Sequence, residues 1–351
     1  MILFTPGPVM VRDEVLAESS RQVISHRGPG FRKLLASVEE LINIVAGNSG
    51  GLAAVMPGSG TTAVDSMLWS LVEPGSRVLA LSWGDFGDRM VESLRRRGAR
   101  VTRVEAAWGE AVPPGDVEDL IKGHDYVAVV HNETSTGVAY RWLRRLAEAA
   151  SSAGARLLVD SVSGLGGEEV RMDWGIYAMA TCSHKALAAP PGVGVVLLSG
   201  EAVKRLRGRP PSMVPPFMDL SSYVRFLVER GETPYTPPVN ALYSLKRALE
   251  YIVDTGVDRY IEVHRVKAEV LYNTGLEPFP RDAGYRSNTV VALRVGNAPR
   301  VKRILEEYGY VVALGMKATR NSVVRIGTMG ATTLEQVSRL AGLLRELGQG
   351  S

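Results

Sequence analysis

The chain is organised around residues 155–189, which have the sequence ARLLVDSVSGLGGEEVRMDWGIYAMATCSHKALAA. This segment opens with Arg156–Val159, a run typical of a buried strand in a parallel sheet, and the run ends on a carboxylate, Asp160. A glycine-rich turn and a second short apolar run follow, and then a lone lysine, Lys185, stands between small and apolar residues. Because open α/β sheets bind ligands at the carboxyl ends of their strands, we expect Asp160 and Lys185 to converge on one ligand.

This pair of residues suits the chemistry of pyridoxal phosphate. A lysine amine can form a Schiff base with the aldehyde of that cofactor, and an aspartate facing the pyridine nitrogen keeps the nitrogen protonated. Surroundings of low polarity disfavour the ammonium form of lysine, which makes its amine a better nucleophile. The simpler interpretation is that Asp160 forms a turn or a helix cap and that Lys185 is a solvated surface group. The local pattern leaves both interpretations open.

Size and composition limit the class of protein. The 351 residues are too many for one typical core and suit a large domain with a smaller one. With 45% hydrophobic and 22% charged residues, the composition is ordinary for a soluble globular protein. The 41 basic and 37 acidic side chains leave a net charge of +4 without a basic patch, so nucleic acid is not an expected partner.

Cysteine and histidine usage bears on compartment and metal binding. Cys182 is the one cysteine, which excludes an internal disulfide and fits a reducing cytosol, so we expect a cytoplasmic protein. No two of the five histidines have the i, i+4 spacing of metal ligands, and no metal site is predicted. Neither an export signal nor an apolar run of bilayer length is present in the sequence, so we expect no membrane association.

A second candidate binding element lies in the first quarter of the chain. The short apolar strand Leu52–Met56 leads into a glycine turn, and a helical pattern then runs to Val72. Backbone N–H groups and the positive end of the helix dipole at such a turn bind phosphate. Ser59 and Thr61 add hydroxyl donors, and Gly60 lets the backbone come close to a ligand.

The same turn also satisfies a loose dinucleotide fingerprint, because Gly58, Gly60 and Ala63 have the required spacing. A nicotinamide-dependent oxidoreductase would then need an acid after the next strand, Val78–Ser82, and Asp85 lies close to that place. The turn that holds Asp85 contains aromatic residues, however, and suits the stacking of a flat ring better than the binding of a ribose. The oxidoreductase is therefore an alternative function.

Strands and helices alternate along most of the chain. We expect further strands at Val101–Glu105, Tyr126–His131 and Val193–Leu198, with helices between them. Short connections between repeated strands and helices predict an α/β fold with a large, doubly wound, mostly parallel sheet.

The alternation breaks between Met213 and Asn240. Two proline-rich stretches there predict a rigid wrapping segment in place of helix or central strand. Helices near Leu242–Asp254 and Asp258–Tyr272 follow, and then strands and helices that predict a smaller C-terminal α/β domain. The expected divisions are an extended N-terminal segment near the active site, a large cofactor-binding domain and a small domain, at residues 1–16, 17–250 and 251–351.

Two further polar features have two interpretations each. Thr134 lies in the polar run NETSTG, residues 132–137, whose hydroxyls either meet a cofactor hydroxyl or cap the next helix. Arg325 interrupts an otherwise apolar strand, and a buried guanidinium needs an anion. That anion is either a substrate carboxylate or an internal Asp or Glu.

Eight motifs occur in the order seen in class V aminotransferases, and the chain most resembles the alanine-glyoxylate and serine-pyruvate branch of that family. The resemblance covers nearly the whole length. The motifs are Thr5-Pro6-Gly7-Pro8, Ser25-His26-Arg27, Gly58-Ser59-Gly60-Thr61, Glu133-Thr134-Ser135-Thr136-Gly137, Asp160-Ser161-Val162, Ser183-His184-Lys185-Ala186-Leu187, Thr236-Pro237-Pro238-Val239-Asn240 and Arg325-Ile326-Gly327-Thr328-Met329-Gly330.

The resemblance implies fold type I of the pyridoxal-phosphate-dependent transferases and a role for each matching residue. Lys185 matches the Schiff-base lysine, Asp160 the partner of the pyridine nitrogen, and Arg325 the arginine that binds the substrate carboxylate, with Gly7 as a further substrate contact. The remaining residues with implied cofactor contacts are Ser59, Gly60 and Thr61 at the phosphate, Phe86 and Val162 at the ring faces, Thr134 near the ring oxygen, and His184 near the phosphate. Phe86 stands where the family usually has tryptophan.

The resemblance also implies a homodimer with shared active sites. Thr236 matches a residue that reaches the cofactor phosphate from the second subunit. A tyrosine that some relatives bring from the same segment is replaced here by Thr233, with Tyr235 nearby as a substitute.

The implied activity is transamination in two half-reactions with ping-pong kinetics. A small amino acid such as alanine or serine gives its amino group to the cofactor, and a 2-oxo acid, glyoxylate or pyruvate, receives it. Aspartate and aminophosphonate transaminases are alternatives on the same scaffold. A cysteine desulfurase would need a mobile catalytic cysteine, whereas Cys182 stands three residues before Lys185. A non-enzymatic protein of this fold would be expected to lack the lysine or the aspartate.

Overall fold

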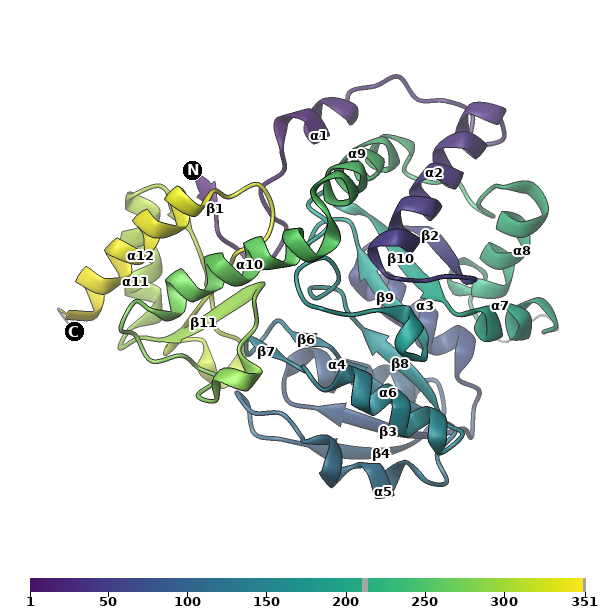
Figure 1. The fold of residues 1–351 in the computed structure, drawn as a ribbon, viewed down its shortest axis with the longest axis horizontal. Coiled ribbons are helices and arrows are strands. Elements are labelled where there is room, and N and C mark those ends of the chain that lie inside the picture. Colours follow the sequence, from purple (N-terminus) through teal and green to yellow (C-terminus); the bar gives the residue numbers. More distant parts are fainter. Residues whose placement is uncertain (210–213, 350–351) are drawn as a thin grey trace.

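The computed structural model describes residues 1–209 and 214–349, and its centre is a seven-stranded sheet (Figure 1). In order across the sheet the strands are β2 (Leu52–Gly58), β10 (Gly192–Leu198), β9 (Ile176–Cys182), β8 (Arg156–Asp160), β5 (Tyr126–Val130), β3 (Arg77–Ser82) and β4 (Arg100–Glu105). Neighbouring strands are parallel except that β10 is antiparallel to both β2 and β9. The predicted large, mostly parallel sheet is confirmed.

The reversed direction of β10 follows from the length of the connection before it. Residues 183–191, which we call the lysine loop, are all that separates β9 from β10. A parallel crossover needs a dozen or more residues, so this loop can only turn back into an antiparallel neighbour. The turn keeps Lys185 at the carboxyl end of β9.

Helices cover both faces of this sheet, as expected of a doubly wound fold. On one face pack α2 (Pro29–Val45), α6 (Leu143–Ser152) and α9 (Val239–Thr255), and on the other α3 (Gly60–Leu71), α4 (Asp85–Arg96), α7 (Gly200–Arg207) and α8 (Leu220–Arg230). The short helices α1 (Asp13–Glu18) and α5 (Glu118–Ile121) lie at the periphery. Because the strands are buried on both faces, adjacent residues such as Leu157 and Leu158 enter different hydrophobic clusters.

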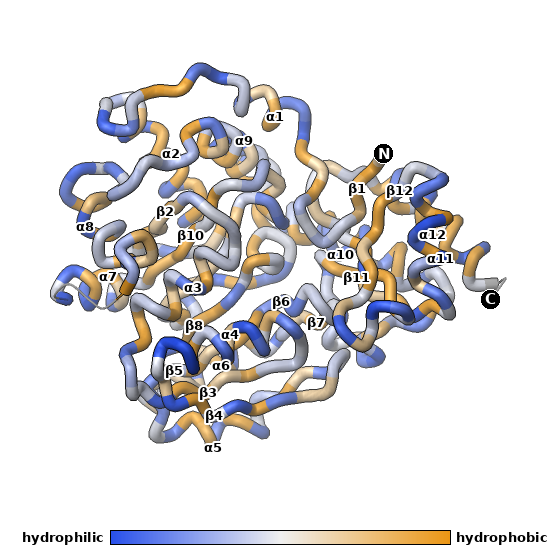
Figure 2. Tube along the Cα trace, turned by 180° about the vertical axis from the view of Figure 1, so that it is seen from behind, coloured by the Kyte–Doolittle hydropathy of each residue, from blue (hydrophilic) through white to orange (hydrophobic). Residues whose placement is uncertain are grey.

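The hydropathy of the chain follows these layers. Figure 2 shows hydrophobic colours along β10 and β3 within the central sheet. No helix within residues 1–209 and 214–349 is long and apolar enough to cross a membrane.

A second, smaller α/β unit contains the last third of the chain and its first residues. Its three-stranded sheet has the order β11 (Val290–Arg294), β14 (Val323–Gly327), β13 (Ala313–Leu314), and its helices are α10 (Val257–Tyr272), α11 (Ala298–Glu307) and α12 (Leu334–Gln349). At its edge β1 (Ile2–Leu3) pairs in parallel with β12 (Tyr310–Val311). The N-terminus and α12 both lie in this unit in Figure 1. The boundary predicted at residues 250 and 251 falls inside α9 and stays a prediction.

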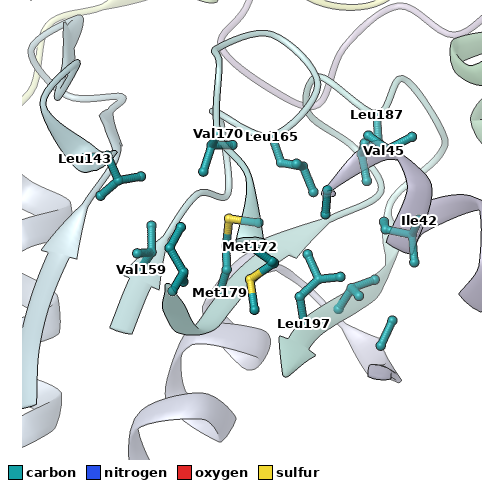
Figure 3. Close-up of a cluster of buried hydrophobic side chains, with 14 of the residues drawn as sticks. Ile42, Val45, Leu143, Val159, Leu165, Val170, Met172, Met179, Leu187 and Leu197 are labelled. Atoms are coloured by element: carbon teal, nitrogen blue, oxygen red, sulfur yellow. The ribbon is translucent and has the colours of Figure 1, made fainter. Parts of the chain in front are cut away.

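The lysine loop is anchored in the main core. Leu187, two residues beyond Lys185, is fully buried and lies in one cluster with Leu165, Met179 and Leu197 (Figure 3). Burial of a leucine side chain is worth about 2 kcal/mol, so this contact restrains the loop that holds the lysine.

The region before α9 contains a helix that was not predicted from the sequence. The two proline-rich stretches between Met213 and Asn240 were predicted to exclude helix and central strand, and α8 spans Leu220–Arg230 between them; Met213 itself lies outside the described residues. The side chain of Asp219 accepts a hydrogen bond from the backbone N–H of Ser221 and caps this helix. The prolines stand before and after α8 and do not interrupt it. Residues 232–238 contain neither helix nor strand, in agreement with the prediction.

Candidate active site

A cavity of about 170 Å³ brings together most of the predicted site residues. It opens at the carboxyl ends of β5 and β8 and at the start of α3. The predicted residues that line it are Ser59, Gly60, Thr61, Phe86, Thr134, Asp160, Val162, His184 and Lys185. Asp160 and Lys185, which were expected to converge, therefore share one cavity.

The amine of Lys185 is held close to the N-terminal segment. Its Nζ donates a hydrogen bond to the backbone carbonyl of Pro6 at 2.5 Å. The next residue, Gly7, has φ +121°, and a Cβ there would lie 2.6 Å from the same Nζ. A side chain at position 7 would therefore collide with the lysine, which explains why glycine is needed.

The acid of Asp160 is the last residue of β8 and is buried. Its Oδ1 accepts a hydrogen bond from the backbone N–H of Val162 at 2.9 Å. Burial raises the pKa of Asp160 to about 7 against the opposing effects of that hydrogen bond and of Lys185. Burial lowers the pKa of Lys185. A positively charged group beside Asp160 would restore its ionised form.

The start of α3 forms the third side of the cavity. Ser59 caps the helix, because its side chain accepts a hydrogen bond from the N–H of Thr62 while Thr62 Oγ1 accepts one from the N–H of Ser59. A Cβ on Gly60 would lie 2.5 Å from a methyl carbon of Val162, so glycine lets the helix start approach the turn after β8. The positive end of the helix dipole points at this end of the cavity.

His184 adds an uncharged polar group. Burial, and secondarily Lys185, lowers the pKa of His184 to about 4, so the ring is neutral at pH 7. Its Nδ1 is buried and has no hydrogen-bond partner among residues 1–209 and 214–349. Since buried polar atoms are normally paired, this atom is available to a ligand.

The two aromatic residues around the start of α4 lie in different environments. Phe86 lines the cavity, whereas Trp83 is buried in the core and stacks on Tyr140 with ring centroids 5.0 Å apart. Asp85 forms ion pairs with Arg89 at 2.9 Å and Lys317 at 2.7 Å. It is therefore engaged within the protein and not free to bind a ribose.

Arg325 lies near the cavity without lining it. Its Nε donates to the carbonyl of Leu314 at 2.8 Å and its Nη1 to the carbonyl of Thr134 at 2.9 Å. No Asp or Glu within the described part of the chain forms a direct ion pair with it, although the nearby charges of Glu133 and Asp85 oppose the lowering of its pKa by burial. Burial lowers the pKa of Arg325 to about 10, which leaves it charged at pH 7.

Thr236 is exposed and does not line the cavity of its own chain. The segment that holds it is fixed by Glu232, which forms ion pairs with Arg27 at 2.9 Å and with Arg32 at 2.8 Å. Thr233 donates its hydroxyl to the carbonyl of Tyr235 within the same segment.

Several cavity residues were not predicted from the sequence. They are Val64, Asp65, Arg89, Met90, Val130, Asn132 and Ser163. Asn132 could have been found, because it follows a strand that ends at this edge of the sheet. Its Oδ1 is buried and has no hydrogen-bond partner in the part of the chain that the structure describes.

Comparison with known families identifies the chain. A family model described as aminotransferase class-V matches residues 57–340, which is most of the sequence. The chain belongs to the class V aminotransferases. Enzymes of this family depend on pyridoxal phosphate, so the oxidoreductase alternative is wrong.

Two relatives and one solved structure resemble this class V aminotransferase over nearly its whole length. The L-aspartate–glyoxylate aminotransferase of Paracoccus denitrificans is 31% identical over 99% of the chain and 93% of its own length. The alanine–glyoxylate aminotransferase of Mus musculus is 31% identical over 98% and 87%. The crystal structure of ureidoglycine–glyoxylate aminotransferase from Bacillus subtilis has a TM-score of 0.91 at 28% identity and covers 98% of the chain and 92% of that structure. The predicted fold type I is confirmed.

The environment of Cys182 bears on the desulfurase alternative. The thiol is fully buried at the end of β9, and burial raises its pKa to about 12. A buried thiol on a central strand is neither mobile nor ionised, so it does not suit desulfurase chemistry.

Proposed function

We propose that this aminotransferase transfers the amino group of a small amino acid, alanine or serine, to a 2-oxo acid, glyoxylate or pyruvate. The observation that supports it best is the shared cavity of Lys185 and Asp160, with the start of α3 as its third side. The three relatives compared above have glyoxylate in their names and differ in the amino donor. Glyoxylate is therefore the better supported acceptor.

The cavity residues fit pyridoxal phosphate by their chemistry. Lys185 offers an amine to the cofactor aldehyde, and Asp160 offers a carboxylate to the pyridine nitrogen. The start of α3 and the unpaired Nδ1 of His184 offer contacts to the phosphate, and Thr134 offers a hydroxyl to the ring oxygen. Phe86 and Val162 are available for the two ring faces. When bound, the cofactor supplies a carbonyl for the amino group and an electron-accepting ring.

The chain itself supplies substrate binding and proton transfer. Arg325 binds the substrate carboxylate, because its guanidinium is charged and its two observed hydrogen bonds go to carbonyls, which do not neutralise it. Lys185 Nζ moves the α-proton, since a lysine with a lowered pKa is neutral for a larger fraction of the time. Its bond to Pro6 and the close approach of Gly7 to the amine support a role for the N-terminal segment in this proton transfer and for Gly7 as a substrate contact.

The proposed active unit is a homodimer. Thr236 is exposed on a segment fixed by Glu232 and lies outside the cavity of its own chain, which fits a contact to the cofactor phosphate of a second copy. Sedimentation of the purified protein tests this part, with a dimer expected. A monomer that binds the cofactor with full affinity would contradict it.

The amino donor is found by single-substrate spectroscopy. Individual amino acids are added to the cofactor-loaded protein without a 2-oxo acid, and the visible absorbance band of the bound cofactor is followed. Alanine or serine should remove the band, and glyoxylate should then restore it. A band that no amino acid changes would contradict transamination, and a response to aspartate alone would replace the proposed donor.

A further inference from the structure

Glu133 is a fully buried carboxylate beside the cavity. It belongs to β6 (Asn132–Glu133), which pairs with β7 (Val138–Ala139) in a short hairpin. Four donors surround its carboxylate. They are the N–H groups of Phe86 at 3.4 Å, Gly87 at 3.0 Å and Ser135 at 3.1 Å, and the hydroxyl of Ser135 at 2.5 Å.

These contacts replace the missing cap of α4. The N-cap residue of this helix is Gly84, which has no side chain to accept a hydrogen bond. Ser135 Oγ instead accepts from the N–H of Asp85 at 2.9 Å, and Glu133 accepts from the next two N–H groups. Three consecutive free amides of the helix start are thus satisfied from a hairpin almost fifty residues away in sequence.

The approach of the two segments is close. A Cβ added to Gly84 would lie 2.5 Å from the carboxyl carbon of Glu133 and 2.5 Å from Ser135 Oγ. Only glycine at position 84 allows the Glu133 carboxylate to come this close to the start of α4.

The hairpin and the helix start both hold residues with proposed roles at the site. Phe86 lies in the first turn of α4 and lines the cavity. Thr134, between the two residues that cap the helix, lines the cavity, and its carbonyl accepts a hydrogen bond from Arg325. One carboxylate therefore connects an expected ring contact, an expected hydroxyl contact and the expected carboxylate-binding guanidinium.

The ionised form of Glu133 fits this environment. Each group bonded to it is a donor, and a carboxylate accepts without donating. The positive end of the α4 dipole further stabilises an anion there. Burial raises the pKa of Glu133, and the hydrogen bonds from Ser135, Gly87 and Phe86 oppose that rise.

We propose that Glu133 is a positioning residue, which fixes the Phe86 ring, the Thr134 hydroxyl and Arg325 relative to one another for cofactor and substrate binding. This inference rests on the proposed function of the cavity. Glu133 does not line the cavity and acts through these neighbours.

The test compares Glu133→Gln with a matched control, Glu168→Gln. Glu168 is also a buried carboxylate that accepts from a backbone N–H, that of Asn288, and from a serine hydroxyl, that of Ser287. It does not line the cavity. Both variants lose a buried charge that accepts hydrogen bonds, so a general loss of stability should appear in both.

The readouts are the dissociation constant of the cofactor, the visible circular dichroism of the bound cofactor, and KM against kcat. We expect Glu133→Gln to weaken cofactor binding by about tenfold, to change the dichroism, and to raise KM for the amino acid. Glu168→Gln should leave all three unchanged. Wild-type values in Glu133→Gln, or equal changes in both variants, would overturn the positioning role.

A milder variant covers the case in which Glu133→Gln does not fold. Ser135→Ala removes one donor to Glu133 and the acceptor for Asp85. It should weaken cofactor binding by about threefold with a dichroism change of the same sign, and an unchanged dichroism would contradict the proposal. If the wild-type protein itself bound no cofactor, the proposed function would fail and not this inference alone.

Discussion

The lysine loop and the segment around Thr236 were both predicted to contact the cofactor, but they differ in their position relative to the cavity. Lys185 lies in a cavity with Asp160, and Leu187 anchors its loop in the core. Thr236 is exposed and outside that cavity. The groups proposed for the chemistry are therefore complete within one chain, whereas one proposed phosphate contact requires a second copy.

The largest effect should come from the lysine loop, whose proposed chemical groups all lie within one chain. Lys185→Ala removes the amine proposed to anchor the cofactor and to move the proton, so kcat should fall by about 10⁴-fold. The cofactor should still bind without forming an adduct that borohydride can trap. Steady-state kinetics and reduction followed by dialysis measure both results. A trappable adduct in this variant would show that an amine other than that of Lys185 anchors the cofactor.

The sequence predicted that Asp160 and Lys185 lie close together, because the signals for this are local. An apolar strand ending in Asp160, a glycine turn and a short loop to Lys185 are adjacent in the chain, and strand polarity alone places their ends at one edge. The antiparallel β10 could have been predicted as well, since the lysine loop is too short for a crossover.

The sequence could not predict contacts between distant segments. The backbone partners of Arg325 on β13 and at Thr134 depend on how the small unit packs on the large one. The capping of α4 by Glu133 likewise joins two segments that no periodicity relates. The segment of Thr236 is likewise held by ion pairs of Glu232 with Arg27 and Arg32, which are distant in the sequence.

A pH-dependent effect should follow from the burial of Asp160. Its pKa in the folded protein without cofactor is raised to about 7, so its contribution to stability is present below pH 4 and is lost as the pH rises to 7. Asp160→Asn cannot ionise. At pH 8 the cofactor-free variant should therefore exceed the wild type in free energy of unfolding by up to about 4 kcal/mol.

Urea unfolding of the cofactor-free proteins between pH 4 and pH 8 measures this difference. With cofactor present the wild type should be the more stable of the two proteins, because the Asp160 carboxylate then pairs with the cofactor. Parallel pH profiles for wild type and variant would show that Asp160 is ionised in the empty cavity.

A smaller effect is expected at the edge of the cavity. Arg325→Ala should raise KM for carboxylate substrates by about 100-fold, because a charge-assisted pair of hydrogen bonds is lost. The matched control is Arg286→Ala, whose guanidinium also donates to backbone carbonyls but lies away from the cavity. Substrate-dependent kinetics separate the two. Equal KM values in both variants would remove Arg325 from the substrate site.

The smallest effect is expected in the exposed segment around Thr236. Thr236→Ala should raise the dissociation constant of the cofactor by about threefold, since one neutral hydrogen bond is lost. Thr255→Ala, which removes a hydroxyl bonded only within α9, is the control. Fluorescence titration at concentrations that keep the dimer intact measures both. An unchanged dissociation constant in Thr236→Ala would show that Thr236 of a second copy does not contact the cofactor phosphate.

The attachment point of the cofactor tests the central claim most directly. The cofactor-loaded wild-type protein is reduced with borohydride, digested, and its lysine peptides are examined by mass spectrometry. We predict the added phosphopyridoxyl mass on Lys185. Lys267 is a sensitive internal control, because burial lowers its pKa to about 8 although it lies outside the cavity. Modification of Lys267, or of any lysine other than Lys185, would contradict the account.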